Sequence, residues 1–305
     1  MPDIYLSIPF TSTRIIKRSD LNMFRFLNDP VLHPGSLGLL RAGTGCLLAL
    51  NALLLWPDAG VMYAHDGLVD LKLLELQQYD YGIAIGNISR WMAGRLPIGG
   101  DTVVRMVLGL YLFLAVLFAY GWRARWTGLG LLVLHTSWHT AVPHWSYGVD
   151  HVAATALVYS LVAPFPQSAY ARPILRLLQL HLCVVYFFGG LGKLLGSTWH
   201  NGEALLKALA QPYHFHRPVV AEYLAGHPMI LTAIGWAVIL LEMGYPVMVW
   251  MYRTRLYGLW AVVILHIAIA LLLGLFQFAA WMILLNITAF QTSDHQPHFT
   301  PSTVR

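Results

Sequence analysis

Charged residues are scarce in this sequence. They make up 11% of the 305 residues, and the mean hydropathy is +0.59, whereas a soluble domain carries about 25% charged residues. A chain of this length with so few charges cannot cover a surface that faces water on all sides. The composition therefore excludes an ordinary soluble protein and predicts one embedded in lipid. Backbone groups in lipid must be hydrogen-bonded internally, so the spans are helices or a closed barrel.

Cysteine is also rare, and Cys46 and Cys183 both fall inside apolar stretches. They form no CxxC pair and no zinc-ligand spacing, so we interpret both as small buried apolar residues. Residues 1–28 lack a long apolar stretch and carry several basic residues. We expect no cleavable signal peptide there and interpret residues 1–35 as a cytoplasmic or interfacial segment. The sequence also lacks an internal repeat, which argues against a repeat-built transporter.

The chain contains a series of apolar stretches separated by short polar loops. Most stretches run to roughly 20 residues, which is the length of a transmembrane helix and about twice that of a barrel strand. We therefore predict an all-α fold, a polytopic transmembrane bundle of about eight helices. The last two helices would join through a tight turn near Phe276. The predicted spans are 36–56, 102–120, 127–143, 149–165, 174–195, 229–250, 256–275 and 276–290.

Basic residues occupy alternate short loops, such as GWRARW (121–126) and YRTR (252–255), while the short loops near 144–148 and 276 contain no Lys or Arg. The positive-inside rule then predicts that both termini lie inside (N-in, C-in). The same rule explains the net charge of +5 better than binding to nucleic acid does. We expect an N-terminal segment (1–35), a transmembrane domain (36–290) and a disordered polar tail (291–305).

Ionisable side chains inside apolar spans are costly, so each is a functional candidate. Glu242 interrupts an otherwise apolar span and must be protonated or paired. Arg41, His181 and His266 are its candidate partners. The six candidates weighed within the spans are Arg41, His135, His181, Lys193, Glu242 and His266, with Asp150 and His151 at the start of the fourth span.

Lys193 follows a cluster of glycines, Gly189, Gly190 and Gly192, near the outer end of its span. Closely spaced glycines let a neighbouring backbone or a ligand approach. Partial desolvation favours the neutral amine, which can act as a base. The alternative is that Lys193 extends to the lipid headgroups.

Histidines are unevenly distributed, because eight of the 14 are predicted at or beyond the outer face. Such a cluster suggests proton handling, a metal or an anionic ligand, and scattered interfacial residues are the alternative. His135 and His139 share a helix face, but no third metal ligand stands at a defined spacing. His181 and His266 could instead be axial haem ligands, a less favoured reading. The outer histidines are His65, His139, His144, His151, His200, His214, His216 and His227.

The stretch YFFGGLGKLLGSTWHNGEAL (186–205) resembles the signature of the HTTM family, the membrane domain related to vitamin K-dependent γ-carboxylase. Four further segments are similar to that family: the start of the first span at 39–41, MYAHDGLV (62–69), WSYGVD (145–150) and the late spans with Glu242 and His266. The resemblance extends over about 36–290.

The resemblance implies a base that deprotonates a quinol on the outer side of the membrane. Lys193 matches the second lysine of the carboxylase pair, Gly192 replaces the first, and Trp199 matches the following tryptophan. His144 is the nearest counterpart of the assisting histidine. The predicted catalytic residues are Lys193, His144, His139 and His151, and the predicted binding or orienting residues are Arg41, Asp150, Trp199, Glu242 and His266, with no metal.

These residues suggest a quinol-linked or peptide-maturation enzyme in a bacterial inner membrane, with a membrane quinone as the expected cofactor. Short bacterial relatives include proteins similar to the membrane component that matures a sporulation-delaying peptide toxin, so membrane or secreted peptide partners are expected beside the bilayer. Glutamate carboxylation is not expected, because only about 15 residues follow the last span. The alternative function is a non-catalytic, partner-binding subunit of a membrane complex.

Overall fold

The computed structural model describes residues 35–69, 84–142, 146–165, 170–211, 218–251 and 253–290, and every regular element in these ranges is a helix. The all-α prediction is therefore confirmed. Each predicted span corresponds to one helix within a few residues. These helices are α2 (Ser36–Leu55), α6 (Gly100–Tyr120), α7 (Ala124–His139), α8 (Gly148–Val162), α9 (Ala171–Leu195), α13 (Pro228–Trp250), α14 (Arg255–Leu273) and α15 (Phe276–Phe290).

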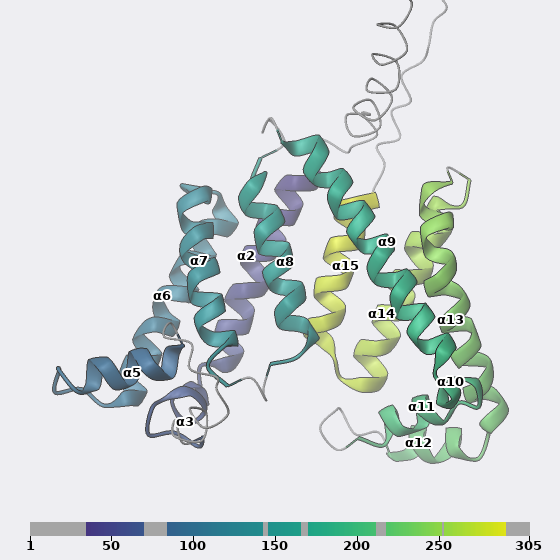
Figure 1. Cartoon of the computed structure of the whole chain (residues 1–305), viewed down its shortest axis with the longest axis horizontal. Coiled ribbons are helices and arrows are strands. Elements are labelled where there is room, and N and C mark those ends of the chain that lie inside the picture. Colours follow the sequence, from purple (N-terminus) through teal and green to yellow (C-terminus); the bar gives the residue numbers. More distant parts are fainter. Residues whose placement is uncertain are drawn as a thin grey trace, which may run out of the picture.

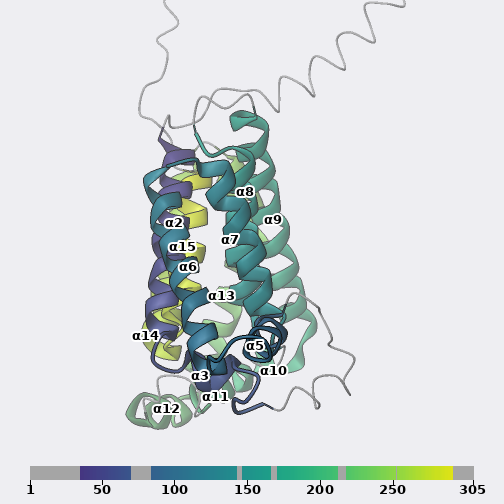
Figure 2. The same cartoon turned by 90° about the vertical axis from the view of Figure 1, so that its left-hand side faces the viewer.

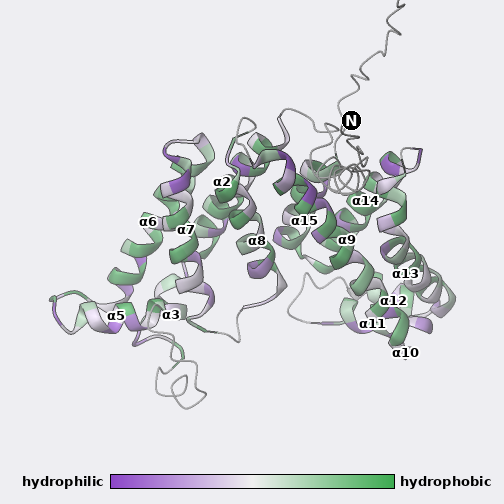
Figure 3. Ribbon diagram, turned by 45° about the horizontal axis from the view of Figure 1, so that its top comes forward, coloured by the Kyte–Doolittle hydropathy of each residue, from purple (hydrophilic) through white to green (hydrophobic). Residues whose placement is uncertain are grey.

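Five of these helices, α2, α6, α9, α13 and α14, are long and apolar enough to cross a membrane, and α8 and α15 are apolar but shorter. Hydrophobic residues extend along the long helices (Figure 3). Many large apolar side chains on them are exposed, for example Leu240 at 67% and Ile264 at 63%. Lipid rather than water suits such a surface, so the protein is an integral membrane protein. The number of crossings and the N-in, C-in orientation remain predictions.

The long helices form two groups joined by α15 (Figures 1 and 2). In one group α2 packs against α6 and α8, and α7 packs against α6 and α8. In the other α13 packs against α9 and α14. Helix α15 contacts α2 and α8 on one side and α9 and α14 on the other. Residues that are distant in the sequence are thereby brought into one bundle with a continuous apolar core.

Short helices gather at one end of the bundle, which we name the short-helix end (bottom of Figure 1). They are α3 (Ala59–Tyr63), α5 (Ile85–Ala93), α10 (Ser197–His200), α11 (Glu203–Leu209) and α12 (Pro218–Ala225). All of them fall in residues 57–101 and 196–228, the two longest gaps between the predicted spans. The turn between α14 and α15 lies at the same end, where Gly274 adopts a left-handed φ of 71°. Glycine tolerates that conformation without steric cost, and the predicted tight turn near Phe276 is confirmed.

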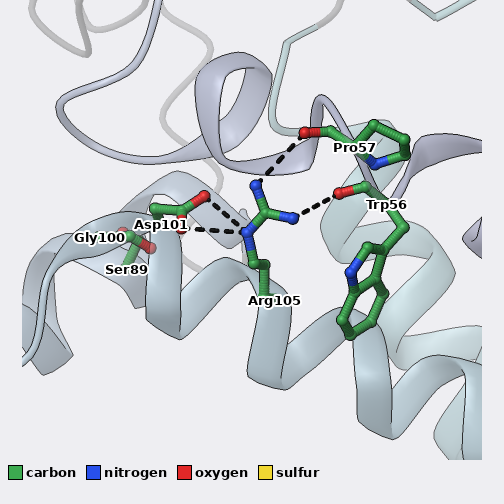
Figure 4. Close-up of polar contacts among 6 residues, drawn as sticks. All are labelled: Trp56, Pro57, Ser89, Gly100, Asp101 and Arg105. Atoms are coloured by element: carbon green, nitrogen blue, oxygen red, sulfur yellow. Dashed lines mark hydrogen bonds and ion pairs between the residues drawn. The ribbon is translucent and has the colours of Figure 1, made fainter.

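Arg105 fastens the last turn of α2 to α6 at the short-helix end (Figure 4). Its guanidinium donates to the carbonyl oxygens of Trp56 (2.7 Å) and Pro57 (3.3 Å), and its Nε donates to Asp101 Oδ1 (2.9 Å). Carbonyls at a helix C-terminus have no partner within the helix. Arg105 therefore satisfies these groups and fixes where the chain leaves α2.

Candidate functional site

Lys193 and Glu242 form an ion pair between α9 and α13. Lys193 Nζ lies 2.6 Å from Glu242 Oε2 and also 3.4 Å from the carbonyl oxygen of Gly189. The Lys193 side chain is 23% exposed and the Glu242 side chain 11%. Glu242 was expected to be protonated or paired with Arg41, His181 or His266, and those candidate partners were wrong. Two charged groups inside apolar helices cost less as a pair than as separate charges.

Gly190 explains why the two charged residues meet. A Cβ atom added at Gly190 would lie 2.9 Å from the backbone nitrogen of Met243 and 3.0 Å from Glu242 Cβ. The backbones of α9 and α13 thus approach more closely than a side chain would allow. A Cβ at Gly189 would lie 3.3 Å from Glu242 Oε2, whereas one at Gly192 would meet nothing within 4 Å. The predicted close approach is confirmed at Gly190.

The ion pair lines an apolar cavity of about 360 Å³. Helices α9, α13, α14 and α15 form its walls, and residues of α10, α11 and α12 close it at the short-helix end. Val185, Leu205, Leu231, Leu265 and Phe278 are typical of the lining. Four of the predicted site residues, Lys193, Trp199, Glu242 and His266, line this one cavity together with Tyr186. We name it the lysine cavity.

Aromatic side chains and a histidine surround the charges in the lysine cavity. Lys193 Nζ lies 5.3 Å from the centroid of the Trp199 ring, within the range of a cation–π interaction. His266 Nδ1 lies 2.8 Å from the carbonyl oxygen of Val262. A carbonyl only accepts, so Nδ1 carries a proton, and in the neutral ring Nε2 is an acceptor. The cavity thus offers the Lys193–Glu242 pair and an imidazole to an apolar guest.

A buried hydrogen-bond network lies among three of the helices that form the walls of the lysine cavity. Asn286 on α15 donates through Nδ2 to the Tyr186 hydroxyl (2.8 Å) and to the carbonyl oxygen of Met282 (2.7 Å), and it accepts from the Tyr245 hydroxyl. The network joins α9, α13 and α15. Asn286 was not among the site residues predicted from the sequence, although a lone amide inside an apolar span is the signal that could have identified it.

A second cavity, of about 140 Å³, lies in the other helix group, and we name it the aspartate cavity. It is lined by Asp150, His139 and Ser146 with several aromatic residues. His139 Nδ1 and Ser146 Oγ are 2.5 Å apart, and the His139 and His151 rings meet edge to face with centroids 4.6 Å apart. Asp150 accepts from the backbone N–H of Tyr147 (3.0 Å) and so caps α8.

The predicted residues therefore divide between separate places. His139, His151 and Asp150 are neighbours, but they do not line the lysine cavity. Arg41 lies toward the opposite end of the bundle, where its guanidinium donates to the carbonyl oxygens of Phe118 (2.6 Å), Ala119 (2.6 Å) and Pro164 (3.1 Å). His144 lies outside the described residues. The catalytic roles of all these residues remain predictions.

The structure shows where the candidate haem ligands, His181 and His266, and the candidate metal ligand His135 lie. His181 bonds the Tyr159 hydroxyl (3.1 Å) and lines a third cavity with His151, whereas His266 lines the lysine cavity. The two residues therefore do not face one another across a shared haem pocket. His135 is buried between the Tyr111 hydroxyl (3.1 Å) and the carbonyl oxygen of Asp150 (3.1 Å). Within the described ranges, no group of three His, Cys, Asp or Glu side chains could hold a metal ion.

Gly190 and Gly192 provide a matched test of the close packing of α9 against α13. We expect Gly190→Ala to lower the free energy of unfolding by about 1–3 kcal/mol, because the new methyl group overpacks against the backbone of α13. Gly192→Ala should cause no loss, because its Cβ has open space. Unfolding of each variant in a detergent titration measures the difference. Equal stability of the two variants would show that α9 and α13 are not in close contact at Gly190.

The fold and the site define a polytopic helical membrane protein with a lysine–glutamate pair in an apolar cavity. The model of the HTTM domain matches residues 166–295, which confirms the predicted resemblance over this part of the chain. It contains α9 to α15 and therefore all of the lysine cavity. No curated protein and no solved structure matches the chain.

Proposed function

We propose that the lysine cavity binds a lipophilic, weakly acidic molecule from the bilayer, with a quinol as the expected class, and that the Lys193–Glu242 pair removes a proton from it. The observation that carries the proposal is the ion pair in the wall of an otherwise apolar cavity. A volume of about 360 Å³ falls in the range of small-molecule pockets. The apolar lining fits a ring system, and the charged pair fits a hydroxyl group that loses its proton.

The pair can serve as the base whichever member holds its proton. If Lys193 is an ammonium, the Glu242 carboxylate accepts the substrate proton directly. If the proton lies on Glu242, the neutral amine of Lys193 accepts it. Both routes lead to the same product, a substrate oxyanion beside the Lys193 ammonium with Glu242 protonated. An ammonium preorganised in a water-poor site stabilises such an oxyanion strongly.

His266 is the histidine best placed to orient the substrate. A quinol has two hydroxyl groups, and Nε2 of the neutral His266 ring can accept a hydrogen bond from the group that does not react. Trp199 and Tyr186 supply aromatic surface for a ring. His139 and His151 line other cavities, so we propose that they act in the outer region of the bundle and that His266 assists Lys193.

The test is to identify what the purified protein retains. The full-length protein would be purified in mild detergent, extracted with organic solvent and analysed by mass spectrometry for quinones. We expect stoichiometric quinone with the native protein, at least tenfold less with Lys193→Met, and an unchanged amount with Lys207→Met. Lys207 forms the matched control pair with Glu203 at 2.7 Å, exposed on α11.

A quinone level equal to that of the bulk lipid, followed by no binding of an added short-chain naphthoquinol, would contradict the proposal. It would favour the alternative function, a partner-binding subunit of a membrane complex, especially if stoichiometric proteins co-purify with Lys193→Met and the native protein alike. Maturation of a peptide is the other enzymatic outcome, and a co-purifying peptide would reveal it. With N-in orientation in a bacterial inner membrane, the lysine cavity would lie toward the outer side.

A further inference from the structure

The aspartate cavity is not used by the proposed function and has an unusual lining. Aromatic side chains surround one carboxylate: Tyr63, Tyr111, Trp138 and Tyr147 line the cavity with Asp150. Neither Lys nor Arg lines it among the residues that the structure describes. His135 is satisfied on both sides in its neutral form, in which Nε2–H donates to the Asp150 carbonyl and Nδ1 can accept from Tyr111. When His135 and His139 are both neutral, the lining carries one negative charge, that of Asp150.

A second observation points to a bound molecule. Trp138 is 8% exposed and lines the cavity, and its indole Nε1 has no hydrogen-bond partner in the described part of the chain. A buried donor without a partner costs about 1–3 kcal/mol, so such groups usually meet a ligand or a water molecule. The Trp138 ring is held in place by an edge-to-face contact with Tyr63, with centroids 4.9 Å apart. A ligand oxygen that reached this N–H from the cavity would satisfy it.

The aromatic hydroxyls near Asp150 stay protonated. Burial, together with the nearby Asp150 carboxylate, raises the pKa of Tyr63 to about 12. The same two causes raise the pKa of Tyr147 above its ordinary value. The tyrosines thus remain neutral at physiological pH, and their ring faces and oxygens favour a cation. An anionic guest would be repelled by Asp150.

We propose that the aspartate cavity binds a small primary ammonium group whose neighbouring atoms carry a hydrogen-bond-accepting oxygen, the chemistry of 2-aminoethanol. The ammonium pairs with the Asp150 carboxylate among the aromatic rings, and the oxygen accepts from Trp138 Nε1. A cavity of about 150 Å³ holds a benzene ring, so about 140 Å³ admits such a group. The cavity lies toward the short-helix end, where the ligand could come from solution or from an aminoethanol lipid headgroup.

The test uses ethanolamine hydrochloride as the probe on full-length protein in detergent free of aminophospholipid. Ethylene glycol is the neutral comparator and glycolate the anionic one, at equal concentration and ionic strength. We expect ethanolamine to raise the unfolding temperature and to change tryptophan fluorescence, with no effect of the two comparators. Equal stabilisation by glycol or glycolate, or no response to ethanolamine, would overturn the proposal.

Substitutions of two lining residues test whether ethanolamine binds in the aspartate cavity. Asp150→Asn should weaken ethanolamine binding at least tenfold, while its amide oxygen can still accept from the N–H of Tyr147 and cap α8. Trp138→Phe should weaken ethanolamine binding roughly fivefold, which is the change in affinity expected from the loss of one hydrogen bond. If Asp150→Asn proves unstable, Trp138→Phe alone decides the result. Unaltered affinity in a folded variant of either residue would refute the assignment.

Two controls complete the experiment. Glu242→Gln alters the lysine cavity alone, so its ethanolamine response should equal that of the native protein, whether or not a quinol binds. Nanodiscs with and without phosphatidylethanolamine distinguish the two sources of the ligand. Weaker binding of free ethanolamine in the phosphatidylethanolamine discs identifies the headgroup as the natural occupant, and equal binding identifies a soluble amine.

Discussion

Substitution of Lys193 by Met is expected to lower the free energy of unfolding by about 3–5 kcal/mol, because it leaves the Glu242 carboxylate buried without its partner. Glu242→Leu should cost a similar amount through the unpaired ammonium. The double variant Lys193→Met/Glu242→Leu should regain most of the loss, since replacing a whole buried pair by apolar residues is often neutral. Unfolding in a detergent titration measures all three.

The same series separates stability from function. If the pair acts as the base, the double variant is stable and yet retains no quinone-dependent activity, whereas a purely structural pair would leave function intact once stability is restored. Lys207→Met serves as the control, because its pair with Glu203 is exposed and exposed pairs contribute little. A double variant no more stable than the singles would contradict the pairing of Lys193 with Glu242.

The spans could be predicted from the sequence because apolar stretches of about 20 residues leave few alternatives to a membrane helix. Every predicted span matches a helix. The short helices α3, α5, α10, α11 and α12 were not predicted, because each has nine residues or fewer and a mixed composition. They matter for the site, because three of them close the lysine cavity.

The residues of the lysine cavity could be predicted from the sequence, but their arrangement in space could not. Lys193 and Glu242 were each recognisable as a charge inside an apolar span. Their pairing depends on the packing of α9 on α13 across 49 positions of sequence, and no local pattern encodes it. His139 and His151 were grouped with Lys193 because the topology places them toward the same end of the bundle. The structure separates them because α15 lies between the two helix groups.

The buried amide of Asn286 provides the second large expected effect. Asn286→Leu should lower the free energy of unfolding by about 2–5 kcal/mol, because the hydroxyl groups of Tyr186 and Tyr245 both lose their partner in a fully buried site. Asn286 and Tyr245 are 0% exposed and Tyr186 is 3% exposed, so water cannot replace the lost bonds. Tyr245→Phe alone should cost about 1 kcal/mol, since hydrogen bonds between membrane helices are individually modest.

Two further variants make the test specific to the network. Thr288, on the same helix, is 0% exposed, and its hydroxyl has no hydrogen-bond partner in the part of the chain that the structure describes. Thr288→Val should therefore leave stability unchanged or raise it. The triple variant Asn286→Leu/Tyr186→Phe/Tyr245→Phe should be more stable than Asn286→Leu, because it removes the unpartnered hydroxyls as well. If the triple variant is instead the least stable, the loss comes from altered packing of α9, α13 and α15, and the hydrogen bonds are not its cause.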